Sequence, residues 1–303
     1  MTNYPPVSAC VFIRNTFDGA FAVFESMASI LPFVSDFLVM DLGSTDGTAH
    51  YLERIAEANP RVRLVRGEFS YQDAGVFATL ANDLIAMCEQ ENVWYYQSDE
   101  IPHERLLLTI YERFLRGDFD LRMWRVQLGY NFQEPRWLPH FVHRVGNRDD
   151  GSFNFVGDGM NTDRYLEPPV VGAYGGEYFP RWSEMWEQRG VKGLAPYMHQ
   201  MLLDVSLLGG FRDNVPARRR MHAPFWHEEP VIPYRAPGTK QDRQLPESEW
   251  VRIAKADERW TQTSTPFDIP HIMEFHVGRT KYELRQELFD ALCQDNTRPL
   301  LGL

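Results

Sequence analysis

The sequence predicts an α/β fold: a mostly parallel sheet with helices on both faces, followed by a helical and extended C-terminal region. Two observations lead to this prediction. Short apolar runs and helical periodicity alternate four times across residues 1–130, which is the pattern of parallel strands joined by crossover helices. Beyond residue 146 the periodicity weakens and Gly, Asn, Asp and Pro become frequent.

The first two strand–helix units are expected in the first 60 residues. A strand is predicted at 7–13, and Asp18 is expected to cap a helix whose apolar residues recur at three- and four-residue spacing. A second strand is predicted at 37–40. Asp46 is a plausible N-cap of the next helix, which Pro60 should end.

Two further units and a strand pair follow. Strands are predicted at 62–65 and 93–96, with a helix after Asp73 between them and another from Pro102 to about Arg116. Segments 121–128 and 138–145 read as strands that could form an antiparallel pair. A long loop is expected at 146–176 and an extended strap at 223–246. Helical signals occur at 181–188, 195–208, 247–256 and 280–293, with 198–208 read as a core helix.

Composition narrows the class of protein. The chain has 303 residues and a formal net charge of −11, which argues against nucleic acid or an anionic membrane surface as the main partner. We expect a domain at 1–215 and a C-terminal extension at 216–303 that packs on it. Three cysteines without metal-ligand spacing, no apparent signal peptide and no apolar run of membrane-spanning length predict a cytoplasmic protein.

The first functional signal is the turn Asp41-Leu42-Gly43-Ser44-Thr45-Asp46-Gly47-Thr48. It follows an apolar strand and leads into a helix. Ligands of open α/β sheets bind beyond the carboxyl ends of such strands, where a carboxylate can accept hydrogen bonds from a base or ribose. The alternative is that Asp41 and Asp46 only shape the turn and cap the helix.

The second signal is the turn Gln97-Ser98-Asp99-Glu100, which follows the fourth strand. Hard oxygen ligands there could hold a divalent cation against a diphosphate. The alternative is that the two acids favour the start of the next helix. Because both turns should lie at the same edge of a parallel sheet, a functional role is the better prediction.

Together these segments resemble the family 2 glycosyltransferases, which have a GT-A fold. The likeness covers about residues 5–130 and rests on Phe12-Ile13-Arg14-Asn15, the 41–48 turn, Ala81-Asn82 and the 97–100 turn. The resemblance implies inverting transfer of a sugar from a nucleotide-diphosphate sugar, usually a UDP-sugar, to the hydroxyl of a glycan or another acceptor. It implies Mn²⁺ or Mg²⁺ as the cofactor.

The resemblance also implies residue roles. Arg14, Asn15 and Asp41 would line the nucleoside pocket, and Asp99 would face the cation and the diphosphate. The expected donor-binding set is Arg14, Asn15, Asp41, Ser44, Asp46, Gln97 and Ser98. Gln97 stands where the family has an acid, which removes one charge from the metal site. An arginine expected before Ala81 is absent, so Arg66 or a residue of the Arg218-Arg219-Arg220 run would have to bind phosphate.

Inverting transfer needs one general base to take the proton of the acceptor hydroxyl. In the family this acid lies after the metal turn, on the acceptor side. Asp158, flanked by glycines, and Glu177, which follows two glycines, are the main candidates; Asp163 and Glu184 are others.

Two other functions stay open. A nucleotide-sugar-binding protein of the same fold that has lost catalysis is consistent with Gln97. A nucleotidyltransferase would also use an α/β sheet with acidic metal ligands, but the chain has no Gly-rich basic phosphate loop near its first strand.

Overall fold

An eight-stranded sheet forms the centre of the protein in the computed structural model. The structure describes residues 4–19, 21–68, 76–98, 100–130, 136–137, 139–149, 151, 153–156, 161–162, 202–208, 231–235, 242–246, 261–262, 270–276 and 282–303. Within 122–141 and within 161–262, it describes only the backbone of these residues.

The first half of the sheet is parallel. β1 (Val7–Ile13), β2 (Asp36–Asp41), β3 (Val62–Arg66) and β4 (Asn92–Tyr95) lie in the order β3-β2-β1-β4. The four predicted strands are confirmed, with bounds that differ by at most one residue. The strand order reverses between β1 and β4, and such a reversal is where open α/β sheets bind their ligands.

The second half of the sheet is mixed. β8 (Pro139–Asn147) runs antiparallel to β4 and to β6 (Leu121–Tyr130), which confirms the predicted antiparallel pair. β11 (Leu202–Leu208) pairs in parallel with β6 and antiparallel with β5 (Glu100–Pro102). The predicted α/β class with a mostly parallel sheet is therefore confirmed.

β11 corrects one prediction. The apolar run at 198–208 favours a core helix, but residues 202–208 form a strand between β6 and β5. A short apolar run fits a buried strand as well as a helical segment, and periodicity does not separate the two. Pairing with strands that are distant in sequence decides the outcome, so the predicted helix is wrong over these residues.

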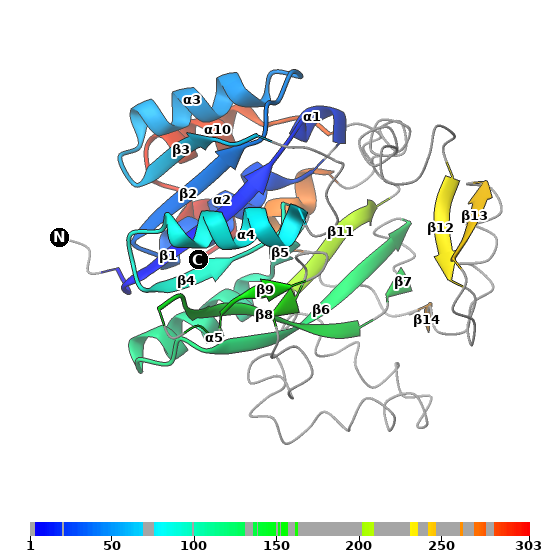
Figure 1. The fold of residues 1–303 in the computed structure, drawn as a ribbon. Coiled ribbons are helices and arrows are strands. Elements are labelled where there is room, and N and C mark those ends of the chain that lie inside the picture. Colours follow the sequence, from blue (N-terminus) through cyan, green and yellow to red (C-terminus); the bar gives the residue numbers. More distant parts are fainter. Residues whose placement is uncertain are drawn as a thin grey trace.

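Helices cover both faces of the sheet. α2 (Val23–Ile30), α3 (Thr48–Ala58), α5 (Glu104–Leu115) and α10 (Gln286–Cys293) contribute to one hydrophobic core, and α4 (Val76–Ala86) contributes to a second. Figure 1 shows α4 in front of the sheet, where it contacts β1 and β4. α3 and α10 also pack together, although they are far apart in the sequence.

Successive side chains of a strand contribute alternately to the two hydrophobic cores. In β4, Trp94 belongs to the core shared with α2, whereas Val93 and Tyr95 belong to the core under α4. Successive side chains of a strand point to opposite faces, so one strand serves both cores.

Short elements complete the described chain. β12 and β13 form an antiparallel pair inside the segment for which an extended strap is predicted. The short elements are α1 (Thr16–Gly19), η1 (Leu31–Phe33), β7 (Arg136–Trp137), β9 (Phe155–Val156), β10 (Asn161–Thr162), β12 (Val231–Arg235), β13 (Asp242–Pro246), β14 (Thr261–Gln262), η6 (His271–His276) and η7 (Arg298–Leu301).

Two predicted helix starts are shifted. Asp18 lies inside α1, and the N-cap of α2 is Ala22, which makes no side-chain capping bond. The N-cap of α3 is Gly47, whose φ of 96° is in the left-handed region that glycine adopts without strain. Asp46 lies one residue earlier, where its Oδ1 accepts from the N–H of Thr48 at 3.1 Å.

The C-terminal residues attach to the same face as α2. Glu25 on α2 is buried, and its carboxylate lies 2.7 Å from Nε2 of His276 and accepts from the hydroxyl of Tyr282 at 2.8 Å. Asn59 Nδ2 donates to the carbonyl of Leu292 at 2.8 Å. The division into 1–215 and 216–303 stays a prediction.

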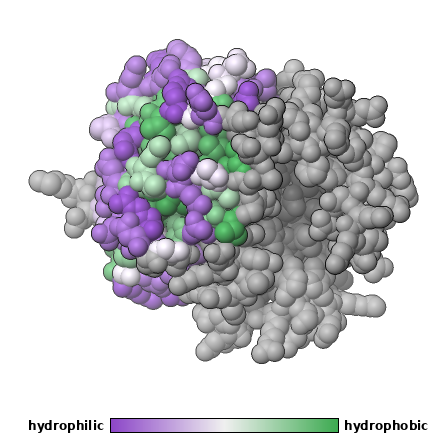
Figure 2. All heavy atoms as spheres, in the orientation of Figure 1, coloured by the Kyte–Doolittle hydropathy of each residue, from purple (hydrophilic) through white to green (hydrophobic). Residues whose placement is uncertain are grey.

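The described part of the surface carries both hydrophilic and hydrophobic residues on the face drawn in Figure 2. Figure 2 shows hydrophilic residues around its periphery, with hydrophobic ones toward the middle of this face. Large apolar side chains that are exposed include Met87, Leu108 and Leu115. None of the helices in the described part of the chain has the length and hydropathy of a membrane span.

Tyr282→Phe should lower the free energy of unfolding at neutral pH by about 2 kcal/mol, because it removes a hydrogen bond to a buried carboxylate. Burial, and then the charge of Glu25, raise the pKa of Tyr282. The unfolded chain ionises this group at about pH 10, so the folded state loses stability as the pH rises above that value. The variant should lose less stability there. Urea unfolding at pH 7 and above pH 10 tests this.

Tyr111→Phe is the matched control, because Tyr111 is partly buried and packs edge-on against Phe33. An alkaline loss of stability as large in Tyr282→Phe as in the unmodified protein would contradict the assignment.

Candidate functional site

The loops that carry the predicted donor-binding residues begin at one edge of the sheet. β1, β2 and β4 are parallel, so their carboxyl ends share that edge. Arg14 and Asn15 follow β1, Asp41 ends β2, and Gln97 lies two residues after β4. The fold therefore brings the two predicted motifs to the same edge of the sheet, after the strands on either side of β1, as the sequence predicts.

Hydrogen bonds between side chain and backbone join the loop after β1 to the loop after β2. The N–H of Asn15 donates to Ser44 Oγ at 2.8 Å, and Asn15 Oδ1 accepts from the N–H of Thr45 at 2.7 Å. Asn15 has a φ of 49°, a left-handed conformation that asparagine tolerates better than most residues. Hydrogen bonds made by Asn15 and Ser44 thus hold the two loops together.

A second pair of bonds extends this contact toward α3. The N–H of Thr16 donates to Thr48 Oγ1 at 2.9 Å. Asp46 Oδ2 accepts from the N–H of Asp18 at 2.8 Å, while its other oxygen accepts from Thr48. Asp46 therefore connects α1 with the start of α3.

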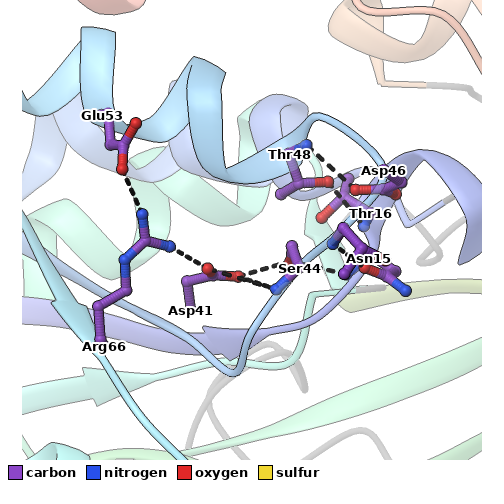
Figure 3. A network of polar contacts seen from close by, with 9 residues as sticks. Asn15, Thr16, Asp41, Ser44, Asp46, Thr48, Glu53 and Arg66 are labelled. Carbon is purple, nitrogen blue, oxygen red and sulfur yellow. Dashed lines mark hydrogen bonds and ion pairs between the residues drawn. The ribbon is translucent and has the colours of Figure 1, made fainter.

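Asp41 is a fully buried carboxylate at the centre of this network (Figure 3). Its Oδ1 accepts from Ser44 Oγ at 2.5 Å and from the N–H of Ser44 at 3.2 Å. Its Oδ2 is paired with Arg66 Nη1, and Arg66 Nη2 pairs with Glu53 on α3. A buried charge requires such partners, since unpaired burial of a carboxylate is very unfavourable.

The pairing of Asp41 with Arg66 follows from strand register. Asp41 and Arg66 lie opposite each other at the ends of β2 and β3. Gly67, the next residue, donates its N–H to the carbonyl of Asp41 at 3.0 Å. A Cβ on Gly67 would lie 2.7 Å from Leu42 Cδ2 and from Met40 Sδ, so a larger residue here would require the ends of these two side chains to shift.

The turn after β4 is closed by its own residues. The N–H of Gln97 donates to Glu100 Oε2 at 3.2 Å, and the N–H of Glu100 donates to the carbonyl of Gln97 at 2.9 Å. Both carboxylate oxygens of Glu100 also accept from Arg144 on β8, at 2.7 and 2.8 Å. The acid that follows Asp99 in the sequence is therefore paired inside the protein.

The side-chain oxygen atoms of this turn are of the kinds that a hard divalent cation prefers as ligands. Gln97 offers an amide oxygen and Ser98 a hydroxyl, both at the carboxyl end of β4, and Asp99 adds a carboxylate in the sequence. Mg²⁺ is held in many proteins by one or two carboxylates together with water and phosphate. Among the described residues, no group of three or more His, Cys, Asp or Glu forms a metal cluster.

Asn82 joins α4 to the segment that precedes Asp158 in the sequence. Its Nδ2 donates to the carbonyl of Phe155 at 3.0 Å, and its Oδ1 accepts from the N–H of Phe155 at 2.8 Å. The Phe155 ring packs edge-on against the Tyr95 ring of β4, with 4.5 Å between the ring centres. Asn82, which contributes to the family resemblance, thus holds β9 against α4, and the Phe155 ring packs β9 against β4.

Several predicted residues lie outside the described part of the chain. They are Asp99, Asp158, Asp163, Glu177, Glu184 and Arg218-Arg219-Arg220. Sequence reasoning missed two charged residues near the site, Glu53, which pairs with Arg66, and Arg144, which pairs with Glu100. The position of Arg144 next to Val145 in a segment predicted to be a strand was the available signal for it.

No protein-family model and no curated protein matches the sequence. The fold is similar to that of S. aureus TarS 1–349, at 13% identity and a TM-score of 0.35, over 52% of this chain and 52% of that chain. It is also similar to the mannosyltransferase PcManGT from Pyrobaculum calidifontis, solved with GDP-Man and Mn²⁺, at 21% identity and a TM-score of 0.30, over 43% and 36% of the two chains.

A further similar structure is glucosyl-3-phosphoglycerate synthase from Mycobacterium tuberculosis, solved with Mn²⁺, UDP and glucosyl-3-phosphoglycerate. It is 22% identical with a TM-score of 0.29, over 41% of this chain and 44% of that chain. The matches span about half or less of each of these chains. At these identities and TM-scores, the likeness carries no argument about the function of this chain.

Ser44→Ala should lower the free energy of unfolding by about 1–3 kcal/mol, because it removes one donor to the buried Asp41 and leaves the N–H of Asn15 without its acceptor. Urea unfolding measures this change. Thr45→Ala is the matched control, since the Thr45 side chain is exposed. Equal losses in the two variants would show that the Ser44 hydroxyl does not hold the loops together.

Proposed function

We propose that the protein is an inverting glycosyltransferase of family 2, which moves a sugar from a nucleotide-diphosphate sugar to an acceptor hydroxyl. The observation that carries the proposal is the placement of two motifs. The Asp41–Thr48 turn and the Gln97–Glu100 turn follow parallel strands on either side of β1, at the edge where such sheets bind ligands. A UDP-sugar is the proposed donor, and a glycan or another hydroxyl compound the proposed acceptor.

Residues at the ends of β1 and β2 are proposed to hold the nucleoside. Arg14, Asn15 and Asp41 line this part of the edge. The Asp41 side chain is fully buried beneath its present partners, so a base or ribose that binds it must displace one of them. Arg66 is the partner suited to exchange, because its side chain is 49% exposed whereas that of Asp41 is 0% exposed.

Residues after β4 are proposed to face the diphosphate. Asp99 would hold Mn²⁺ or Mg²⁺, with Gln97 and Ser98 beside it. A bound divalent cation stabilises the negative charge that develops on the departing diphosphate. Glu100 is excluded from this ligand set by its bidentate pairing with Arg144.

The proposed reaction exchanges one bond at the anomeric carbon. The acceptor oxygen forms a bond to that carbon from the face opposite the diphosphate, while the bond from carbon to phosphate oxygen breaks. The general base takes the hydroxyl proton during the attack. Asp158 is the first candidate for this base, and Glu177 is the second.

A nucleotide-sugar-binding protein without turnover is the second candidate function. Gln97 favours it, because an amide replaces the acid that the resemblance implies and lowers the negative charge available to a cation. Release of free nucleoside diphosphate in the presence of an acceptor distinguishes the enzyme from the binding protein.

UDP together with Mn²⁺ should raise the melting temperature more than UDP in EDTA. A ligand present at about 100 times its dissociation constant adds about 2.7 kcal/mol of stability. In Asp99→Ala the part that depends on Mn²⁺ should be lost, whereas Glu57→Ala, a change at an exposed position on α3, should behave like the unmodified protein. Absence of metal-dependent stabilisation by any nucleoside diphosphate would refute the metal-assisted proposal.

Replacement of the true base should lower kcat by about 10²- to 10⁴-fold and leave donor binding unchanged. Asp158→Asn and Glu177→Gln test the two candidates against each other in a product-release assay, with UDP binding measured in parallel. Each variant is the control for the other. If neither lowers kcat, the base is another residue.

A further inference from the structure

A buried ion pair lies directly after the turn that follows β4. Arg144 Nε donates to Glu100 Oε2 at 2.8 Å, and Nη2 donates to Oε1 at 2.7 Å. Both side chains are 0% exposed. Two parallel bonds between planar groups fix the orientation of the carboxylate as well as its position.

Glu100 is also tied to two other parts of the fold. It exchanges hydrogen bonds with the backbone of Gln97 at the start of the turn. Its carbonyl accepts from Ser26 Oγ on α2 at 2.5 Å. Contacts from β8, from α2 and from the turn itself therefore converge on the residue that follows Asp99.

Stability alone gives a weak account of this pair. Both charges have been removed from water, and apolar residues of similar volume often stabilise a core as well as a buried ion pair does. The surroundings are partly aromatic, since the guanidinium carbon of Arg144 lies 5.8 Å from the centre of the Tyr95 ring. A bidentate pair differs from apolar packing because it fixes the orientation of the Glu100 carboxylate.

We infer that Glu100 and Arg144 are positioning residues, which hold the turn so that Asp99 meets the cation and the diphosphate. The inference rests on the proposed function. Consecutive Cα atoms are about 3.8 Å apart, so fixing Glu100 limits the positions open to Asp99. The pair acts through Asp99, and neither Glu100 nor Arg144 contacts the ligand.

Calorimetric titration of Mn²⁺ in the presence of UDP tests the inference. Loss of a residue that supports a metal ligand weakens metal affinity by about 10- to 100-fold. We expect a loss of this size in Glu100→Gln, with little change in the affinity for UDP measured in EDTA. Arg144→Lys keeps the charge but loses the bidentate geometry. Its Mn²⁺ affinity should therefore lie between that of the unmodified protein and that of Glu100→Gln.

A double variant separates positioning from folding. Glu100→Met combined with Arg144→Met leaves no unpaired buried charge, so it should unfold at a urea concentration close to that of the unmodified protein. Its Mn²⁺ affinity should nevertheless be as low as that of Glu100→Gln. Arg113→Met is the control, because it breaks the Arg113–Asp118 pair at the far end of α5.

The outcomes distinguish the inference from the proposed function. If the unmodified protein binds UDP in a metal-dependent way and the folded variants bind Mn²⁺ equally well, the positioning role is overturned and the proposed function stands. If the unmodified protein shows no metal-dependent binding of UDP, both fail. Should the single variants not fold, the double variant decides, and its own failure to fold would assign the pair to folding and overturn the positioning role.

Discussion

The burial of the Asp41 carboxylate is the constraint on which the geometry of the site depends. A charge at the end of a central strand needs partners, and Ser44 and Arg66 supply them. Ser44 in turn accepts from the backbone of Asn15, so the requirement of one carboxylate orders the loops after both β1 and β2. Asn15, Ser44 and Asp41, three of the predicted donor-binding residues, are thus held close together by hydrogen bonds to one another.

Two acids near the ends of parallel strands are each paired with an arginine, and the two pairs differ in exposure. Arg66 is 49% exposed, so its partner Asp41 is accessible to a ligand that displaces it. Arg144 and Glu100 are 0% exposed, so that pair is closed to solvent. On the proposed function, the first pair belongs to a surface that binds and the second to the support beneath a metal ligand. The same two residue types serve either role, and solvent access decides between them.

Much of the parallel half of the sheet is predictable, because its signals are local. Short apolar runs, helical spacing and turn residues each extend over a few residues, and they locate β1 to β4 within one residue. The shared edge of the two motifs follows from the same reasoning. β11 shows the limit: its apolar run suits a helix or a strand, and the pairing with β6 and β5 that decides the matter leaves no pattern in the run itself.

The sequence by itself determined the α/β class and the positions of Asp41 and Gln97 at or just after the ends of parallel strands. Only the tertiary structure decided which side chain pairs with which acid. Glu100 and Arg144 are 44 residues apart and Glu25 and His276 are 251 apart, and contacts over such separations depend on how strands and helices pack. The physical reason is that local propensities act along the chain, whereas a buried charge is neutralised by whatever the fold places beside it.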